Sequence, residues 1–163
     1  MPGLPYDRPM ADPGERVASD LKSAIRAGNR ERVGTLRLLL ADLKNQEIRD
    51  RGEGGGGRLD DEAFAGVVRK GIKQRKEAAE QFRKGGREEA AAREEREAEI
   101  LAGYLPAQAG EDEIRAAIEA FVEEQGLEGR AAIGRLMQAM IARFGARADG
   151  ATINRIAREV LEC

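Results

Sequence analysis

The sequence predicts an all-α protein built from two helical subdomains, and three observations support this prediction. Aromatic residues make up only 4% of the chain and charged residues 36%, a composition that favours helices over strands. Apolar residues recur at spacings of three and four, which places them on one face of a helix. Capping residues and glycines stand where those periodic segments begin and end. We expect a disordered tail at 1–11, an N-terminal helical hairpin or bundle at 12–105 and a C-terminal three-helix subdomain at 106–163.

Two helices joined by a short turn are expected first. Asp12 can cap a helix that has Pro13 at its first position, and Gly28 closes that helix. Asn29 can cap a second helix at 30–50. So short a connection requires the two helices to be antiparallel. The residues expected to face inward are Val17, Leu21 and Ile25 on the first helix and Val33, Leu36, Leu39, Leu40, Leu43 and Ile48 on the second.

The segment at 51–58 is glycine-rich, with four consecutive glycines, Gly54–Gly57. A phosphate-binding loop would need a lysine and a serine or threonine at fixed spacing, followed directly by a helix. The segment has neither, so we expect a flexible linker.

A third helix is expected at 61–84, with Asp60 as its cap. The pair Gly85-Gly86 breaks or bends this helix, and 87–103 resumes it with an excess of glutamates. Pro106 then forces an extended break, which we take as the boundary between the subdomains.

The C-terminal subdomain is expected to hold a helix at 111–125 and then a helix, a turn and a helix over 130–161. Gly145 can end the first helix of that pair, and Asp149 can cap the second. Asp149 is also the only acid between the first and last of six arginines. Such a pair of helices, apolar inside and cationic outside, indicates a polyanionic partner whose binding weakens steeply with salt. The six are Arg130, Arg135, Arg143, Arg147, Arg155 and Arg158.

Histidine is absent from the chain, and Cys163 is its only cysteine. The lack of histidine removes the commonest general base at neutral pH and the commonest metal ligand, and it excludes Ser-His-Asp or Cys-His catalysis within this chain. We therefore expect no catalytic residues, no metal and no cofactor. No apolar run approaches the roughly 20 residues needed to cross a bilayer, and the first ten residues lack the apolar core of a signal peptide. We expect a cytoplasmic protein that does not enter membranes.

A second basic run, at 66–87, has three interpretations. It is a second phosphate-contacting face, a set of partners for the glutamates of 87–99 across a hairpin, or a solvated face with pairs such as Lys73–Glu77 and Lys76–Glu80. Tyr104 is expected to pack between the subdomains. The scarcity of aromatic residues favours recognition of phosphate and shape over base stacking.

Four motifs follow one another along the chain: Leu36-Arg37-Leu38-Leu39-Leu40; Lys73-Gln74-Arg75-Lys76-Glu77 with Gln81-Phe82-Arg83-Lys84-Gly85-Gly86-Arg87; Tyr104-Leu105-Pro106-Ala107-Gln108; and Ile133-Gly134 through Met137 with Ala148-Asp149-Gly150. In this order and at these spacings they resemble the YqeY-like proteins of the GatB/YqeY family. The resemblance runs from about Glu15 to Leu161. The family usually has Ser in place of Ala78 and Asp in place of Glu89.

The resemblance implies an all-helical protein whose C-terminal part is similar to the tail domain of the B subunit of the tRNA-dependent amidotransferase. In that enzyme the tail helps to hold the tRNA, while the chemistry takes place elsewhere. Our first hypothesis is a non-catalytic accessory protein that binds tRNA or another structured RNA. The alternatives are a component of an amidotransferase-type assembly, which transfers an amide from glutamine, and a protein–protein adaptor. The expected RNA-binding residues are Arg135, Arg143, Arg147, Arg155, Arg158, Lys73, Arg75, Lys76 and Arg87.

Overall fold

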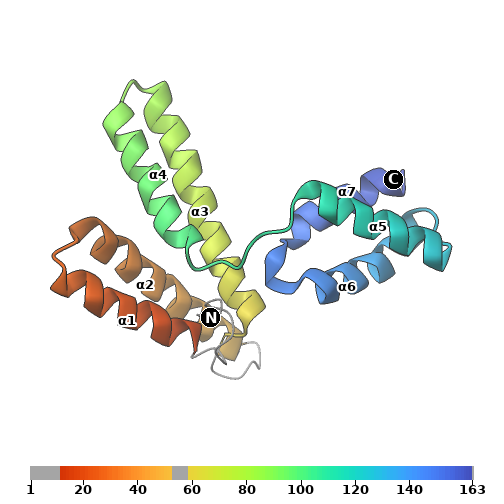
Figure 1. Cartoon of the computed structure of the whole chain (residues 1–163), viewed down its shortest axis with the longest axis horizontal. Helices are drawn as coiled ribbons and strands as arrows, with labels where there is room; N and C mark the ends of the chain where they lie inside the picture. The colour runs from red at the N-terminus through yellow and green to blue at the C-terminus, as the bar shows by residue number, and fades with distance from the viewer. Residues whose placement is uncertain (1–11, 53–58, 163) are drawn as a thin grey trace, which may run out of the picture. The chain divides into compact units, whose positions relative to one another are not determined.

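The computed structural model describes residues 12–52 and 59–162, and within these residues it contains helices and no strand. The prediction of an all-α fold is therefore confirmed. The expected tail at 1–11, most of the glycine-rich linker at 51–58, and Cys163 lie outside the described residues. The helices in Figure 1 are α1 (Pro13–Arg26), α2 (Arg30–Gly52), α3 (Asp61–Lys84), α4 (Glu88–Ala102), α5 (Glu111–Gln125), α6 (Ile133–Phe144) and α7 (Gly150–Val160), with short 3₁₀ helices at Arg130–Ala132 and Gly145–Arg147.

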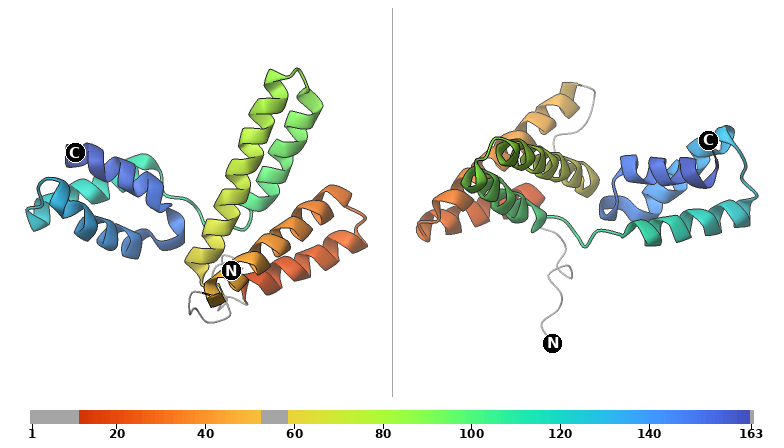
Figure 2. Two further views of the ribbon diagram at one scale, coloured as in Figure 1. Left: turned by 180° about the vertical axis from the view of Figure 1, so that it is seen from behind. Right: turned by 90° about the horizontal axis from the view of Figure 1, so that it is seen from above.

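The chain divides into two compact units, the first ending at Tyr104 and the second beginning at Leu105. In the first unit, α1 and α2 form an antiparallel hairpin, as Figures 1 and 2 show. Asp12 caps α1 by accepting a hydrogen bond from the Gly14 backbone N–H. Gly28 takes a φ of 69° in the turn, and Asn29 Oδ1 accepts from the Arg32 N–H at 3.1 Å to cap α2. The expected capping residues of this hairpin are therefore confirmed.

The other hairpin of the first unit consists of α3 and α4, which make the most extensive helix–helix contact in the described chain. Asp60 caps α3, accepting from the Ala63 N–H at 2.7 Å. Gly86, with a φ of 73°, turns the chain back, so the Gly85-Gly86 pair ends the helix rather than bending it. Close approach of the two helices depends on Gly71, because a Cβ there would lie 3.0 Å from Leu101 Cδ1.

The core of the first unit differs from the expected one at two positions. Val17, Leu36, Leu39 and Leu43 are buried as expected. Ile25 and Ile48, expected to face inward, are 51% and 57% exposed. The prediction was wrong for Ile25 on α1 and Ile48 on α2 because spacing alone does not say which face of a helix its neighbours cover, and α2 carries apolar residues on more than one face.

Tyr104 is the last residue of the first unit and is buried. Its hydroxyl donates a hydrogen bond to Asp20 Oδ2 at 2.5 Å, and the Arg16 guanidinium lies 5.2 Å from the centre of its ring. Tyr104, expected to pack between the subdomains, makes these contacts with α1 inside the first unit. Burial raises the pKa of the Tyr104 hydroxyl, and the hydrogen bond to the Asp20 carboxylate raises it further.

We expect Tyr104 to stay protonated well above pH 10, the ordinary pKa of tyrosine. A pKa that is raised in the folded state stabilises the fold while the hydroxyl is protonated, so this contribution is complete below pH 10 and is lost as the pH rises through the folded-state pKa. The measurement is a titration of tyrosinate absorbance in the wild type and in Tyr104→Phe, whose difference isolates this residue. A difference curve with its midpoint near pH 10 in the folded protein would contradict the prediction.

The second unit is a three-helix arrangement of α5, α6 and α7 around one apolar core. Gly126 ends α5 in the left-handed conformation. Asp149 caps α7, as expected, by accepting from both the backbone N–H and the hydroxyl of Thr152 at 2.8 Å. The core residues are Ile114, Ala117, Ile118, Ala132, Leu136, Met140, Phe144, Ala148, Ile153, Ile156, Ala157 and Leu161.

The segment that precedes α5 is joined to the turn between α6 and α7. The Ala109 N–H donates to the Arg147 carbonyl at 2.8 Å, and Gln108 Nε2 donates to the Ala146 carbonyl at 3.1 Å. In return, Arg147 Nε donates to the Ala107 carbonyl at 3.3 Å. These three hydrogen bonds fix the position of the turn that carries Arg147.

Candidate nucleic-acid interface

Three arginines of the second unit, Arg115, Arg147 and Arg155, are neutralised by acids, Arg115 by Glu159. Arg147 Nη2 lies 3.1 Å from both carboxylate oxygens of Glu113. Arg155 pairs with Glu111 through Nη2, and its Nη1 lies 2.9 Å from Glu159 Oε1. Hydrogen bonds from Arg115 and Arg155 lower the pKa of Glu159, which keeps it ionised. The expected cationic outer surface is thus corrected where α7 and the turn meet α5, because α5 brings acids to this edge.

The other arginines of the second unit keep their charge uncompensated by a carboxylate in the described part of the chain. Arg135 donates to the neutral Gln125 side chain at 2.6 Å, and Arg158 donates to Asn154 Oδ1 at 2.9 Å. The Arg143 guanidinium lies 5.9 Å from the centre of the Phe144 ring. Arg130 is exposed. Neutral partners hold a guanidinium in place without cancelling its field.

The charges that remain gather on α6 and the turn of 3₁₀ helix before it. We call the exposed residues Arg130, Arg135, Gln138, Ala142 and Arg143 the α6 face. No acid occurs in the sequence from 129 to 148. Arg135 and Arg143 are eight residues apart, which separates them by about 12 Å along the helix and about 80° around it. The α6 face is therefore a cationic surface with no acid of its own, suited to contacts with more than one phosphate.

Arg158 stands apart from the ion pairs of its own helix. Arg155 and Glu159 lie on the edge of α7 that meets α5, as their pairs with Glu111 and Arg115 show. One residue corresponds to about 100° around an α-helix, so Arg158 points about 100° away from Glu159. Arg158 donates to Asn154 on its own helix and takes no part in the ion pairs between α5 and α7.

Of the four basic residues expected on the first unit, Arg75 and Lys73 belong to ion pairs, one between helices and one within a helix, and Lys76 and Arg87 do not pair with an acid among the described residues. Arg75 is almost buried, and its Nε lies 3.3 Å from Glu97 Oε2 across the α3–α4 hairpin. Lys73 Nζ lies 4.0 Å from Glu77 on the same helix. The Arg87 guanidinium lies 5.2 Å from the centre of the Phe82 ring, and Lys76 is exposed. Of the three interpretations of this run, hairpin partners and i,i+4 pairs both occur, whereas phosphate contact stays a prediction.

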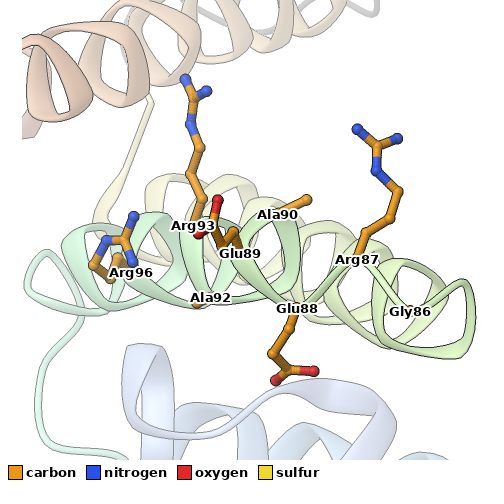
Figure 3. A pocket seen from close by; sticks show the side chains of 8 residues that line it. All are labelled: Gly86, Arg87, Glu88, Glu89, Ala90, Ala92, Arg93 and Arg96. Atoms are coloured by element: carbon orange, nitrogen blue, oxygen red, sulfur yellow. The ribbon is translucent and has the colours of Figure 1, made fainter.

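A broad hollow of about 930 Å³ runs along α4 near the α3–α4 turn. Figure 3 shows Arg87 and Arg93 extending from one side of the helix and Glu88 from the other. Two of its three cations are already paired with acids, Arg93 with Glu97 at 3.3 Å and Arg96 with Glu31 at 3.2 Å, while Arg87 lies over the Phe82 ring. The hollow thus mixes both signs of charge, and we assign no ligand to it. It is lined by Gly86, Arg87, Glu88, Glu89, Ala90, Ala92, Arg93 and Arg96.

The described residues do not bring three or more acidic, cysteine or histidine side chains together in an arrangement that could hold a metal ion. Among the same residues, each helix is either too short or too polar to cross a bilayer.

Comparison with models of protein families identifies the family to which this helical chain belongs. The model of the family described as "Yqey-like protein" matches residues 14–161. The chain belongs to the YqeY-like family. The resemblance drawn from the sequence motifs is thereby confirmed, and the match covers both units of this YqeY-like protein.

Curated relatives of this YqeY-like protein are named "Altered inheritance of mitochondria protein 41, mitochondrial". The relative from Lachancea thermotolerans is 39% identical over 89 residues, which is 55% of this chain and 46% of the relative. That from Eremothecium gossypii is 34% identical over 110 residues, covering 66% and 58%. A third, from Pyrenophora tritici-repentis, is 28% identical over 151 residues, covering 90% and 79%. The chain thus spans about half the length of the first two relatives.

The names of these relatives correct one expectation. A cytoplasmic location was expected from the lack of a signal peptide and of a membrane span. The relatives are named as mitochondrial proteins, so the comparison points to the mitochondrion rather than to the cytoplasm. Proteins of the cytoplasm and of the mitochondrion can share the same fold and charge, so composition could not predict the compartment.

Proposed function

We propose that this YqeY-like protein is a non-catalytic accessory protein that binds tRNA or another structured RNA through the α6 face of its second unit. The observation that carries the proposal is the set of exposed arginines on and before α6 with no acid from 129 to 148. Arg135 and Arg143 stand at its centre, held by neutral groups. A concentrated cationic surface binds a phosphate backbone mainly by releasing counterions.

The ion pairs of the second unit decide which arginines contribute most. Arg147 and Arg155 would have to leave Glu113 and Glu111 to contact phosphate, whereas Arg135, Arg143 and Arg158 only exchange a neutral partner. We therefore rank Arg135, Arg143 and Arg158 above Arg147 and Arg155. The similarity of this part of the chain to a tRNA-holding tail domain supports an RNA ligand over other polyanions.

The test is a filter-binding titration of the full chain against total tRNA at several salt concentrations. We expect Arg135→Gln with Arg143→Gln to weaken binding at least about tenfold and to reduce the slope of log affinity against log salt by roughly 2, since each phosphate contact contributes about one unit. The matched control is Arg147→Gln with Arg155→Gln, which removes the same number of charges of the same type but from existing ion pairs.

Two results would overturn the proposal. One is a wild-type affinity no better than millimolar at low salt. The other is an Arg135→Gln, Arg143→Gln variant that binds as the wild type does. If the control pair instead lost more affinity than the α6 pair, the RNA site would lie at the α5–α7 edge, contrary to our ranking.

A further inference from the structure

Helix α2 presents apolar side chains to solvent as well as to the core. Leu36, Leu39 and Leu43 are at most 4% exposed, whereas Leu38 and Ile48 are 58% and 57% exposed. A helix that is apolar around most of its circumference is normally covered on more than one side. In the described chain α2 contacts α1, α3 and α4, and these leave its Leu38–Ile48 side uncovered.

The uncovered residues form a regular pattern. Gly34, Leu38, Ala41, Asn45 and Ile48, which we call the α2 seam, are spaced by four, three, four and three residues, and all of them are exposed. This alternation keeps side chains on one line along a helix and is the spacing by which one helix packs against another. Gly34 and Ala41 let a neighbouring backbone approach closely, while Leu38 and Ile48 supply the large apolar contacts.

A row of cations borders the α2 seam along one edge. Arg30, Arg37, Lys44 and Arg51 follow one another at intervals of seven residues, so each lies only about 20° from the last around the helix. All four are exposed. Lys44 pairs with Glu47 on its own helix at 3.6 Å, and among the described residues no carboxylate lies within ion-pair distance of the other three.

The opposite edge of the α2 seam opens into a groove of about 330 Å³ between α2 and α3. Asn45 belongs to both the seam and the groove, and the charged residues that line the groove are one acid, Asp42, and two cations, Arg49 and Lys70. The α3 wall includes Ala63 and Gly66, and a Cβ added at Gly66 would meet nothing within 4 Å. The groove therefore has room beside α2 for side chains of a helix that lies on the seam.

We propose that the α2 seam is the docking site for an amphipathic helix of a partner protein, with large apolar residues at spacings of three and four and with Asp or Glu along the edge that faces Arg30, Arg37, Lys44 and Arg51. Such helix-in-groove recognition takes its affinity from the apolar anchors and its choice of partner from the flanking charges. Two-fold antiparallel pairing of α2 with a second copy would set the cation row against itself, which disfavours self-association through this face. RNA would use the cations but not Leu38 and Ile48.

The experiment measures binding of the full chain to two labelled helical peptides by fluorescence anisotropy. Each peptide carries leucines at the seam positions over about three heptads, with Glu at the flanking positions in one and Lys in the other. Each peptide carries like charges that oppose its self-association, so the two peptides differ only in the sign of the charge at the flanking positions. We expect the Glu peptide to bind at least about tenfold more tightly than the Lys peptide, a difference of about 1.4 kcal/mol.

Two variants locate the binding on α2. Leu38→Ser with Ile48→Ser should weaken binding of the Glu peptide at least about tenfold. Arg37→Glu with Lys44→Glu should reverse the preference between the peptides. Both pairs replace exposed side chains, and circular dichroism verifies that helix content is unchanged.

Several results would overturn this inference. Equal binding of the two peptides, binding of neither, or no effect of Leu38→Ser with Ile48→Ser would each do so. Light scattering that shows a dimer lost in the Leu38→Ser, Ile48→Ser variant would assign the face to a second copy. Loss of tRNA binding in Arg37→Glu with Lys44→Glu, without peptide binding by the wild type, would assign the cations to RNA. The outcome is independent of the α6 face, because the variants lie in different units.

Discussion

Replacing Leu136 with alanine is expected to lower the free energy of unfolding of the second unit by about 3 kcal/mol. Leu136 is fully buried at the centre of the apolar core that α5, α6 and α7 share. Truncation removes its apolar contacts and leaves a cavity that neighbours such as Ile153 and Ile156 fill only in part. A unit of roughly sixty residues has only a few kcal/mol of stability to lose. We therefore expect a substantial unfolded fraction of this unit at 25 °C.

Hydrogen exchange followed by mass spectrometry is the appropriate measurement, because it reports the two units separately within one chain. In Leu136→Ala, peptides from α5, α6 and α7 should lose protection, while those from α1 to α4 keep it. The matched control is Leu38→Ala, which removes the same atoms from a side chain that is 58% exposed. Equal loss of protection in the two variants would show that burial of Leu136 does not stabilise the second unit.

Gly71→Leu is expected to destabilise the first unit by about 2–3 kcal/mol. Gly71 is buried where α3 and α4 approach, and even a Cβ there would lie 3.0 Å from Leu101 Cδ1. Leu101 is itself only 1% exposed, so it has little room to move. The added side chain must displace Leu101 or separate the two helices, and both lose packing.

Gly66→Leu is the control for this prediction. Gly66 lies on the same helix, is exposed and has nothing within 4 Å of an added Cβ. Both variants gain the same helix propensity and the same side chain, and they differ only in the space available. Urea unfolding followed by circular dichroism should give a lower midpoint for Gly71→Leu than for the wild type, and a midpoint for Gly66→Leu that is unchanged or higher. Similar midpoints for the two variants would show that α3 and α4 are not closely packed at Gly71.

Local chemistry was sufficient to predict the helices and their ends. Asp12, Asp60 and Asp149 cap the helices that follow them because an N-cap needs only its own carboxylate and backbone donors two or three residues away. Burial could not be predicted equally well. Ile25 on α1 and Ile48 on α2 have the spacing of core residues, yet which face of each helix is covered depends on where other helices lie, and that information is not local.

In the candidate RNA-binding site too, local features could be predicted from the sequence and contacts between distant residues could not. The sequence identified the arginines of 130–158, but it did not identify their partners, because Glu111 and Glu113 lie 44 and 34 residues from Arg155 and Arg147. Counting charges within one stretch misses acids that a preceding helix brings alongside. The neutral partner of Arg135, Gln125, lies ten residues away and could not be predicted either. The contact of Arg158 with Asn154 was missed, although its i,i+4 spacing could have indicated it.

The hydrogen bonds between 107–109 and the turn at 145–147 bear on how the two halves of the protein can be separated. These residues precede the first helical residue of α5, yet Ala107, Gln108 and Ala109 all hold the far turn through main-chain groups or an amide. The C-terminal half therefore begins, as a folding unit, ahead of its first helix. A fragment that starts at Glu111 would lose these three hydrogen bonds, because it lacks residues 107–109. A fragment that starts before Pro106 would keep all three.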